Sequence, residues 1–112
     1  MIWSIDYTED AEQDLQNIYD YISNTLLEPV TAAKQINRIL DAVDFLYHMP
    51  LRYRIYDHEP WRSKGLRVMP VNNYVVFYLP DEQKGSVSII RIMYGGRDME
   101  KHLSEPDTSF QA

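Results

Sequence analysis

The chain has 112 residues, 45% of them hydrophobic, a formal net charge of −6 and no cysteine. This length predicts one domain with its own core, and the lack of cysteine excludes disulfides and thiolate metal sites. The sequence contains no run of about 18 apolar residues, and Met1–Asp6 lacks the basic-then-apolar pattern of a signal peptide. We therefore expect a cytoplasmic protein that does not enter a membrane.

The charge is divided unevenly along the chain. Residues 1–50 hold nine acidic residues against Lys34 and Arg38, whereas residues 51–102 hold nine basic and six acidic residues. A basic second half suits a surface that meets an anionic partner. An acidic first half is also what solvated helices commonly show, so both interpretations stay open.

Apolar periodicity predicts a strand and two helices in the first half of the chain. Alternating apolar residues indicate a strand over Met1–Tyr7, and Thr8 offers an N-cap for a helix over about 9–25. Pro29 suits the first turn of a second helix that ends near 48–50. The predicted apolar faces comprise Ala11, Leu15, Ile18, Ile22 and Leu26 in the first helix, and Ala33, Ile36, Ile39, Leu40, Val43 and Leu46 or Tyr47 in the second.

The second half reads as an irregular segment followed by strands. Residues 51–64 show no clear period, whereas 65–98 contain three β-rich runs separated by the Asn72-Asn73 pair and by a loop that ends at Gly85. A last helical turn or two is predicted over 98–103. The polar tail, residues 104–112, is expected to be flexible.

The predicted order of elements is β-α-α-β-β-β with a short C-terminal helix, which is an α+β fold. We expect one domain over residues 1–103, in which an antiparallel helical hairpin packs on one face of a mostly antiparallel sheet of four to five strands. The first strand has a long connection to the others, so it is expected to pair in parallel with a later strand.

Arginines and aromatic residues fall together on the predicted strands. We expect the sheet face turned away from the helices to present Arg67, Arg91, Tyr94 and Arg97. Further binding residues are expected at Tyr74, Tyr78, Lys64 and His102. Such a surface suits phosphate contacts and base stacking in single-stranded RNA, although the same residues also cover exposed sheets as ordinary structure. Arg91 stands among apolar residues, so its charge must meet solvent, a sheet edge or a carboxylate.

The histidines predict no metal site. His48, His58 and His102 stand at no metal-ligand spacing, and we expect neither a metal nor another cofactor. His102 lies one helical turn after Asp98 and is either a general acid or base or a solvated residue at the end of a helix.

Three motifs in order carry a resemblance to a known family. They are Gly65-Leu-Arg67, Asn73-Tyr74-Val-Val-Phe-Tyr78 and Ile90-Arg-Ile-Met-Tyr-Gly-Gly-Arg-Asp98. With the preceding strand and helical hairpin, this layout resembles the RelE/ParE superfamily of type II toxin–antitoxin toxins over about residues 1–103. The resemblance implies a small toxin whose partner is a cognate antitoxin that wraps around it.

The superfamily divides by target. RelE-like toxins cleave mRNA on the ribosome without a metal, and ParE-like toxins bind DNA gyrase and are not known as nucleases. The resemblance implies RelE-like cleavage first, with gyrase inhibition or an inactive antitoxin-binding module as alternatives. In the nuclease, Arg67 would contact phosphate, Arg91 and Arg97 would stabilise charge, and Tyr94 would stack or transfer a proton.

Two positions depart from the RelE-like pattern. Val75 and Gly96 stand where RelE-like members carry arginines. A chain with a net charge of −6 is also repelled by RNA phosphates. Both observations favour a protein target such as gyrase over an RNA target.

Overall fold

The computed structural model describes residues 3–95 and 103. Their elements are β1 (Ser4–Tyr7), α1 (Glu9–Asp20), the π-helical turn η1 (Tyr21–Thr25), α2 (Pro29–Asp44), the 3-10 turn η2 (Phe45–Tyr47), α3 (Trp61–Lys64), β2 (Arg67–Val71), β3 (Tyr74–Asp81) and β4 (Ser86–Tyr94). This order confirms the predicted α+β fold, and α3 adds one short helix to the segment that showed no clear period. The predicted flexible tail over 104–112 lies outside the described residues, as does the C-terminal helix over 98–103 except for Leu103.

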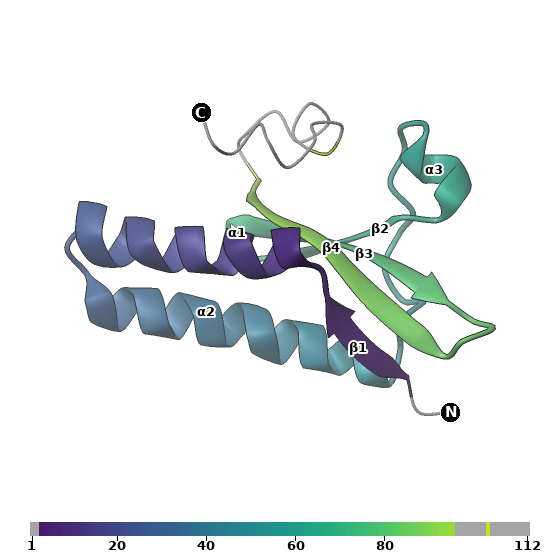
Figure 1. Ribbon diagram of the computed structural model, residues 1–112, viewed down its shortest axis with the longest axis horizontal. Helices are drawn as coiled ribbons and strands as arrows, with labels where there is room; N and C mark the ends of the chain where they lie inside the picture. The colour runs from purple at the N-terminus through teal and green to yellow at the C-terminus, as the bar shows by residue number, and fades with distance from the viewer. Residues whose placement is uncertain (1–2, 96–102, 104–112) are drawn as a thin grey trace.

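The four strands form one sheet in the order β1-β4-β3-β2 (Figure 1). β1 pairs in parallel with β4 from Ser4↔Ser86 to Tyr7↔Ile89, and the other pairs are antiparallel. The parallel pair confirms the expectation for the first strand. Asn72 turns the β2–β3 hairpin at a φ of 55°, a left-handed conformation that asparagine adopts more readily than most residues.

The hairpin of α1 and α2 begins as its capping residues predict. The Thr8 hydroxyl accepts a hydrogen bond from the Ala11 N–H at 3.0 Å and donates one to the Ile90 carbonyl at 2.9 Å. It therefore joins the first turn of α1 to the middle of β4 as well as capping the helix. Pro29 stands in the first turn of α2, where its missing N–H costs no helical hydrogen bond.

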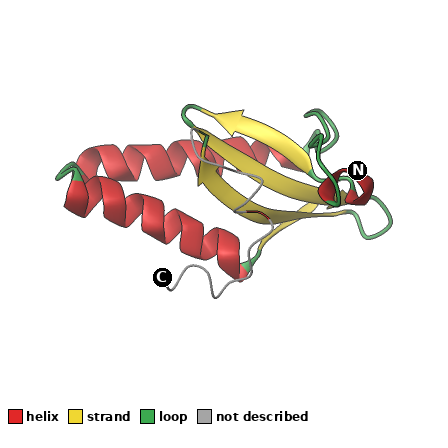
Figure 2. Ribbon diagram, turned by 90° about the horizontal axis from the view of Figure 1, so that it is seen from above, coloured by secondary structure: helices red, strands yellow, loops and turns green. Residues whose placement is uncertain are grey.

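The two helices cover one face of the sheet, and their paired ends extend beyond it (Figures 1 and 2). The first core lies between helices and sheet and consists of Trp3, Ala11, Ile39, Val43, Leu46, Met69, Val71, Val76, Tyr78, Val87, Ile89 and Ile92. Two predicted core positions are wrong. Ala32 is buried and Ala33 is exposed, and Leu26 lies in the exposed loop after η1. Of the two residues offered for the last core position of the second helix, Leu46 is buried and Tyr47 is exposed.

The other face of the sheet carries a second core. Tyr56, Leu66, Val68, Phe77, Met93 and Leu103 are buried together there, with Trp61, Val75, Leu79 and Ile90 packed around them. The segment between α2 and β2 and the described residue Leu103 thus cover a face that we expected to be open. This expectation is wrong, because the irregular segment supplies apolar side chains that need burial as much as those of the helices.

A β-bulge aligns β4 with both cores. The register shifts between Phe77 and Tyr78, so that Phe77 pairs with Arg91 and Tyr78 with Ile89. The extra residue, Ile90, lets Ile89 and Ile92 reach the same core although they stand three positions apart. None of the helices within the described ranges is long and apolar enough to cross a membrane.

Candidate functional site

Arg91 forms a buried ion pair with Asp14 of α1. Its Nε and Nη2 donate to the two carboxylate oxygens at 2.8 and 3.0 Å, and Asp14 also accepts the Ile92 N–H at 2.9 Å. Both side chains are less than 10% exposed. The sequence left solvent, a sheet edge or a carboxylate as partners for Arg91, and in the structure its partner is the carboxylate of Asp14.

The course of α1 explains why this pair forms. β1 ends at Tyr7, opposite Ile89, so the remaining edge of β4 has no neighbouring strand among the described residues. α1 lies along that edge, and the side chains of Thr8 and Asp14 take the backbone groups of Ile90 and Ile92 as partners. The expectation that Arg91 faces an uncovered sheet surface is therefore wrong.

Arg67 lies on the helix-covered side of the sheet. It pairs across the strands with Tyr78, which is completely buried in the first core and donates its hydroxyl to the Pro50 carbonyl at 2.8 Å. Arg67 Nη1 donates to the carbonyls of Leu51 and Tyr53 at 3.2 and 2.6 Å. These bonds hold the irregular segment against β2. The expectation that Arg67 and Tyr78 share an uncovered face with Arg91 is wrong.

The other candidate residues lie apart from these arginines. Tyr74 and Tyr94 are cross-strand neighbours with ring centroids 5.7 Å apart, and Tyr94 is half-exposed. Lys64 stands in α3 with its ammonium 4.9 Å from the centre of the Trp61 ring. Arg97 and His102 lie outside the described residues.

No cationic cluster therefore forms among the predicted residues that the structure describes. Arg67 belongs to the face of the first core and Arg91 to that of the second, and both guanidinium groups have protein partners. Among the predicted site residues that the structure describes, two pairs are neighbours: Tyr74 with Tyr94, and Arg67 with Tyr78. Within the described part of the chain, Arg67 and Arg91 therefore do not direct their charges to one point.

The sequence contained a signal for the ion pair that we did not use. Asp14 stands three residues after Ala11 and four before Ile18, which is a position on the apolar face of α1. A single acid inside an apolar helix face and a single arginine inside an apolar strand are a natural pair, since neither charge is buried alone.

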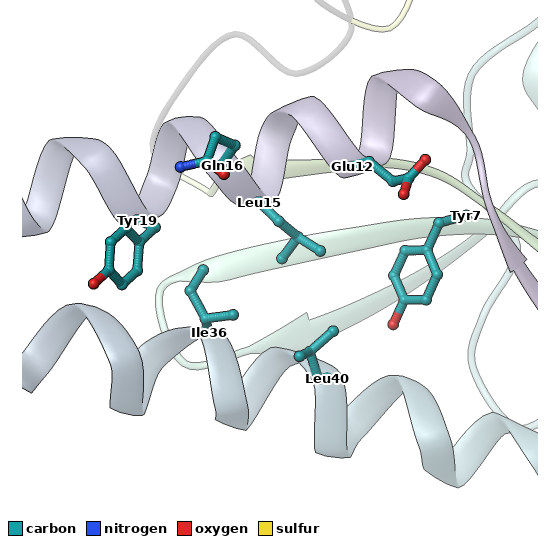
Figure 3. Close-up of a pocket in the computed structure, with 7 residues that line it drawn as sticks. All are labelled: Tyr7, Glu12, Leu15, Gln16, Tyr19, Ile36 and Leu40. Atoms are coloured by element: carbon teal, nitrogen blue, oxygen red, sulfur yellow. The ribbon is translucent and has the colours of Figure 1, made fainter.

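A groove of about 520 Å³ lies between α1 and α2 (Figure 3). Leu15, Ile36 and Leu40 supply its apolar side chains, and Tyr7 closes one end. Glu12, Gln16 and Tyr19 supply polar atoms from α1. Burial, and next to it the negative charge of Asp44, raises the pKa of Tyr7 to about 12, so that its phenol keeps its proton even above pH 10. The groove suits an apolar segment with polar edges more than a charged ligand.

Comparison with known families decides the identity of the chain. The family model described as ParE toxin of the type II toxin–antitoxin system parDE matches residues 5–99. The chain belongs to the ParE toxin family. Comparison with curated protein sequences found no match.

Solved structures share the fold of this toxin. The chromosomal ParDE toxin–antitoxin system of P. aeruginosa contains a chain that is 22% identical, with a TM-score of 0.70 over 83% of the toxin and 96% of that chain. A chain of the RelBE2 complex of Mycobacterium tuberculosis is 19% identical, with a TM-score of 0.61 over 84% and 99% of the two chains. A mutant of the E. coli toxin RelE in the free state is 10% identical, with a TM-score of 0.62 over 93% and 95%.

Burial of Tyr78 predicts a loss of stability of the toxin in alkali. Burial raises the pKa of Tyr78 to about 12, so the unfolded chain loses this phenolic proton at lower pH than the native chain. The free energy of unfolding should be unaffected below about pH 10, the ordinary tyrosine pKa, and should fall as pH rises toward 12. Urea unfolding at several pH values measures this slope.

Two variants isolate the contribution of Tyr78. Tyr78→Phe should be less stable by about 1 kcal/mol at neutral pH, because the hydrogen bond to Pro50 is lost, and its alkaline slope should be shallower. Tyr19→Phe removes an exposed phenol and should keep the wild-type slope. Equal slopes for Tyr78→Phe and the wild type would show that Tyr78 ionises normally.

Proposed function

We propose that this toxin arrests growth by binding DNA gyrase, as ParE-like toxins do, and that it does not cleave RNA. The observation that carries the proposal is the placement of Arg91 in a buried ion pair with Asp14. A charge stabiliser for phosphate cleavage must face the substrate, and this guanidinium faces α1. Separating the pair would leave two uncompensated buried charges.

The surroundings of the other arginine support the same choice. Arg67 is held by two backbone carbonyls on the helix-covered side, and the completely buried Tyr78 offers no ring for base stacking. Metal-independent cleavage needs several preorganised cationic groups at one phosphate. With the net charge of −6, these placements favour a protein target over mRNA on the ribosome.

We infer that the groove between α1 and α2 receives part of the cognate antitoxin. Its apolar side chains, Leu15, Ile36 and Leu40, are only partly buried by the toxin itself. An apolar face of a helix or an extended segment would complete their burial, which is how amphipathic peptides dock in grooves. Neutralisation would then follow from a segment seated on the helices, at a distance from the second core.

Two reactions with the purified toxin test these proposals. We expect the wild type to inhibit DNA supercoiling by purified gyrase and to leave mRNA intact in an in vitro translation reaction. The cognate antitoxin should restore supercoiling. It should do so poorly with Leu40→Lys, because that variant places a charge in the groove.

Other outcomes would contradict the proposed activity. Codon-specific cuts in the mRNA with normal supercoiling would establish the RelE-like nuclease instead. No effect in either reaction, together with tight antitoxin binding, would indicate an inactive module. If the antitoxin fully restores supercoiling in the presence of Leu40→Lys, the groove is not the docking site of the antitoxin.

A further inference from the structure

The joined ends of α1 and α2 form an apolar tip that the first core does not use. Tyr21, Leu26, Leu27 and Val30 are between 48% and 77% exposed there. Figures 1 and 2 both show this end of the hairpin extending away from the sheet. The tip is therefore open to a partner on several sides, and no described residue of the sheet is placed to cover it.

The backbone of the tip departs from regular helix in two ways. α1 ends in the π-helical turn η1, whose last hydrogen bonds run from the Leu26 N–H to Tyr21 and from the Glu28 N–H to Ile22. Leu27 then takes a φ of 58°, the left-handed region that leucine rarely adopts. Its side chain is also the most exposed of the four, so burial within the toxin does not compensate the strain.

The charges beside the tip select its partner. Asp20 and Glu28 are both exposed, and Lys34 is the sole basic residue of the sequence between Glu9 and Asn37. This acidic rim repels nucleic-acid phosphates, which argues against RNA. It also opposes a second copy of the tip.

We propose that the hairpin tip is the anchor by which this toxin engages its target protein, entering an apolar pocket that is rimmed by basic residues. The inference rests on the proposed function, in which that target is gyrase. A strained, exposed leucine beside an exposed tyrosine suits a compact anchor, since few central side chains supply most of the binding energy in such contacts. The groove and the tip then separate antitoxin binding from target binding.

Leu27→Asn tests the anchor. Asparagine tolerates the left-handed conformation, so the melting temperature should stay unchanged or rise. The concentration that half-inhibits gyrase supercoiling should increase about 30-fold, which corresponds to about 2 kcal/mol. Phe45→Asn is the matched control: Phe45 is 71% exposed at the far end of α2, and its loss should leave inhibition within about twofold of the wild type.

Asp20→Lys tests the acidic rim. Lysine near the end of α1 is favoured by the helix dipole, so the fold should be retained. We expect inhibition of gyrase by the wild type to decline as salt is added. Inhibition by Asp20→Lys should be weaker than that of the wild type and should not decline with salt. Wild-type potency and salt dependence in Asp20→Lys would contradict a basic rim on the target.

Growth arrest in cells keeps the two proposals distinguishable. If wild-type toxin arrests growth without affecting gyrase, gyrase is not the target. In that case the tip proposal is supported when Leu27→Asn no longer arrests growth and Phe45→Asn still does, and any other pattern contradicts it. Full arrest by a folded Leu27→Asn protein would overturn the tip proposal. If the wild type cleaves mRNA and Leu27→Asn does not, the tip does not bind a protein pocket. If the wild type is not toxic, both proposals are overturned.

Discussion

Replacing Asp14 with alanine is expected to lower the free energy of unfolding by about 3–5 kcal/mol, as removal of one partner from a buried ion pair does. The substitution leaves the guanidinium of Arg91 buried without its carboxylate, and it leaves the Ile92 N–H without an acceptor. Because Thr8 and Asp14 are the side chains that join α1 to the free edge of β4, the helix should also pack less firmly there. Urea denaturation followed by circular dichroism measures the loss.

Two further variants show whether the cost comes from the ion pair. Glu12→Ala removes an exposed acid two residues away and should change the free energy of unfolding by less than about 0.5 kcal/mol. The double variant Asp14→Leu/Arg91→Met removes both charges and should recover much of the stability, since apolar replacements of buried pairs are often tolerated. A nearly wild-type Asp14→Ala protein would mean that Arg91 does not depend on this carboxylate.

Phe77→Ala is expected to destabilise the toxin by about 3–5 kcal/mol. Phe77 is completely buried on the face opposite the helices, and its ring meets that of Tyr56 edge-on at 5.5 Å. Its removal opens a cavity between β3 and the segment before β2. Thermal and urea unfolding measure the loss, and the size of the effect tests whether this face is a true core.

Phe45→Ala is the control for Phe77→Ala. It removes the same side chain from a position that is 71% exposed, so its stability should stay within about 0.5 kcal/mol of the wild type. A similarly small effect for Phe77→Ala would indicate that the second face of the sheet opens easily. In that case the face becomes available to a target, RNA included.

These two sites bear on function because they occupy the surface where a nuclease centre was expected. One side of the sheet is packed by α1 and α2, and the other by Tyr56, Leu66 and their neighbours. Part of the described surface that is left for a partner belongs to the helices. The groove and the tip are both there, on the acidic half of the chain.

Local chemistry was enough to predict the strands, α1 and α2 with most of their boundaries, but not the short helix α3. Thr8 caps α1, Pro29 lies in the first turn of α2, and Asn72 turns the β2–β3 hairpin, each for a reason contained in a few neighbouring residues. The length of the connection after β1 was enough to predict a parallel pairing with a later strand, and the structure shows that this strand is β4. The resemblance carried by the strand motifs likewise agrees with the family match over residues 5–99.

The surroundings of the candidate site required the tertiary structure. Whether Arg91 meets solvent or a carboxylate depends on Asp14, which stands 77 positions earlier in the chain. Which face of the sheet is covered depends on where an aperiodic segment folds, and no local pattern determines that. The sequence by itself thus determined the family, the order of elements and the turns, because short-range preferences are additive along the chain. Only the folded chain decided which charges are neutralised and which apolar residues stay exposed, because these depend on contacts between distant segments.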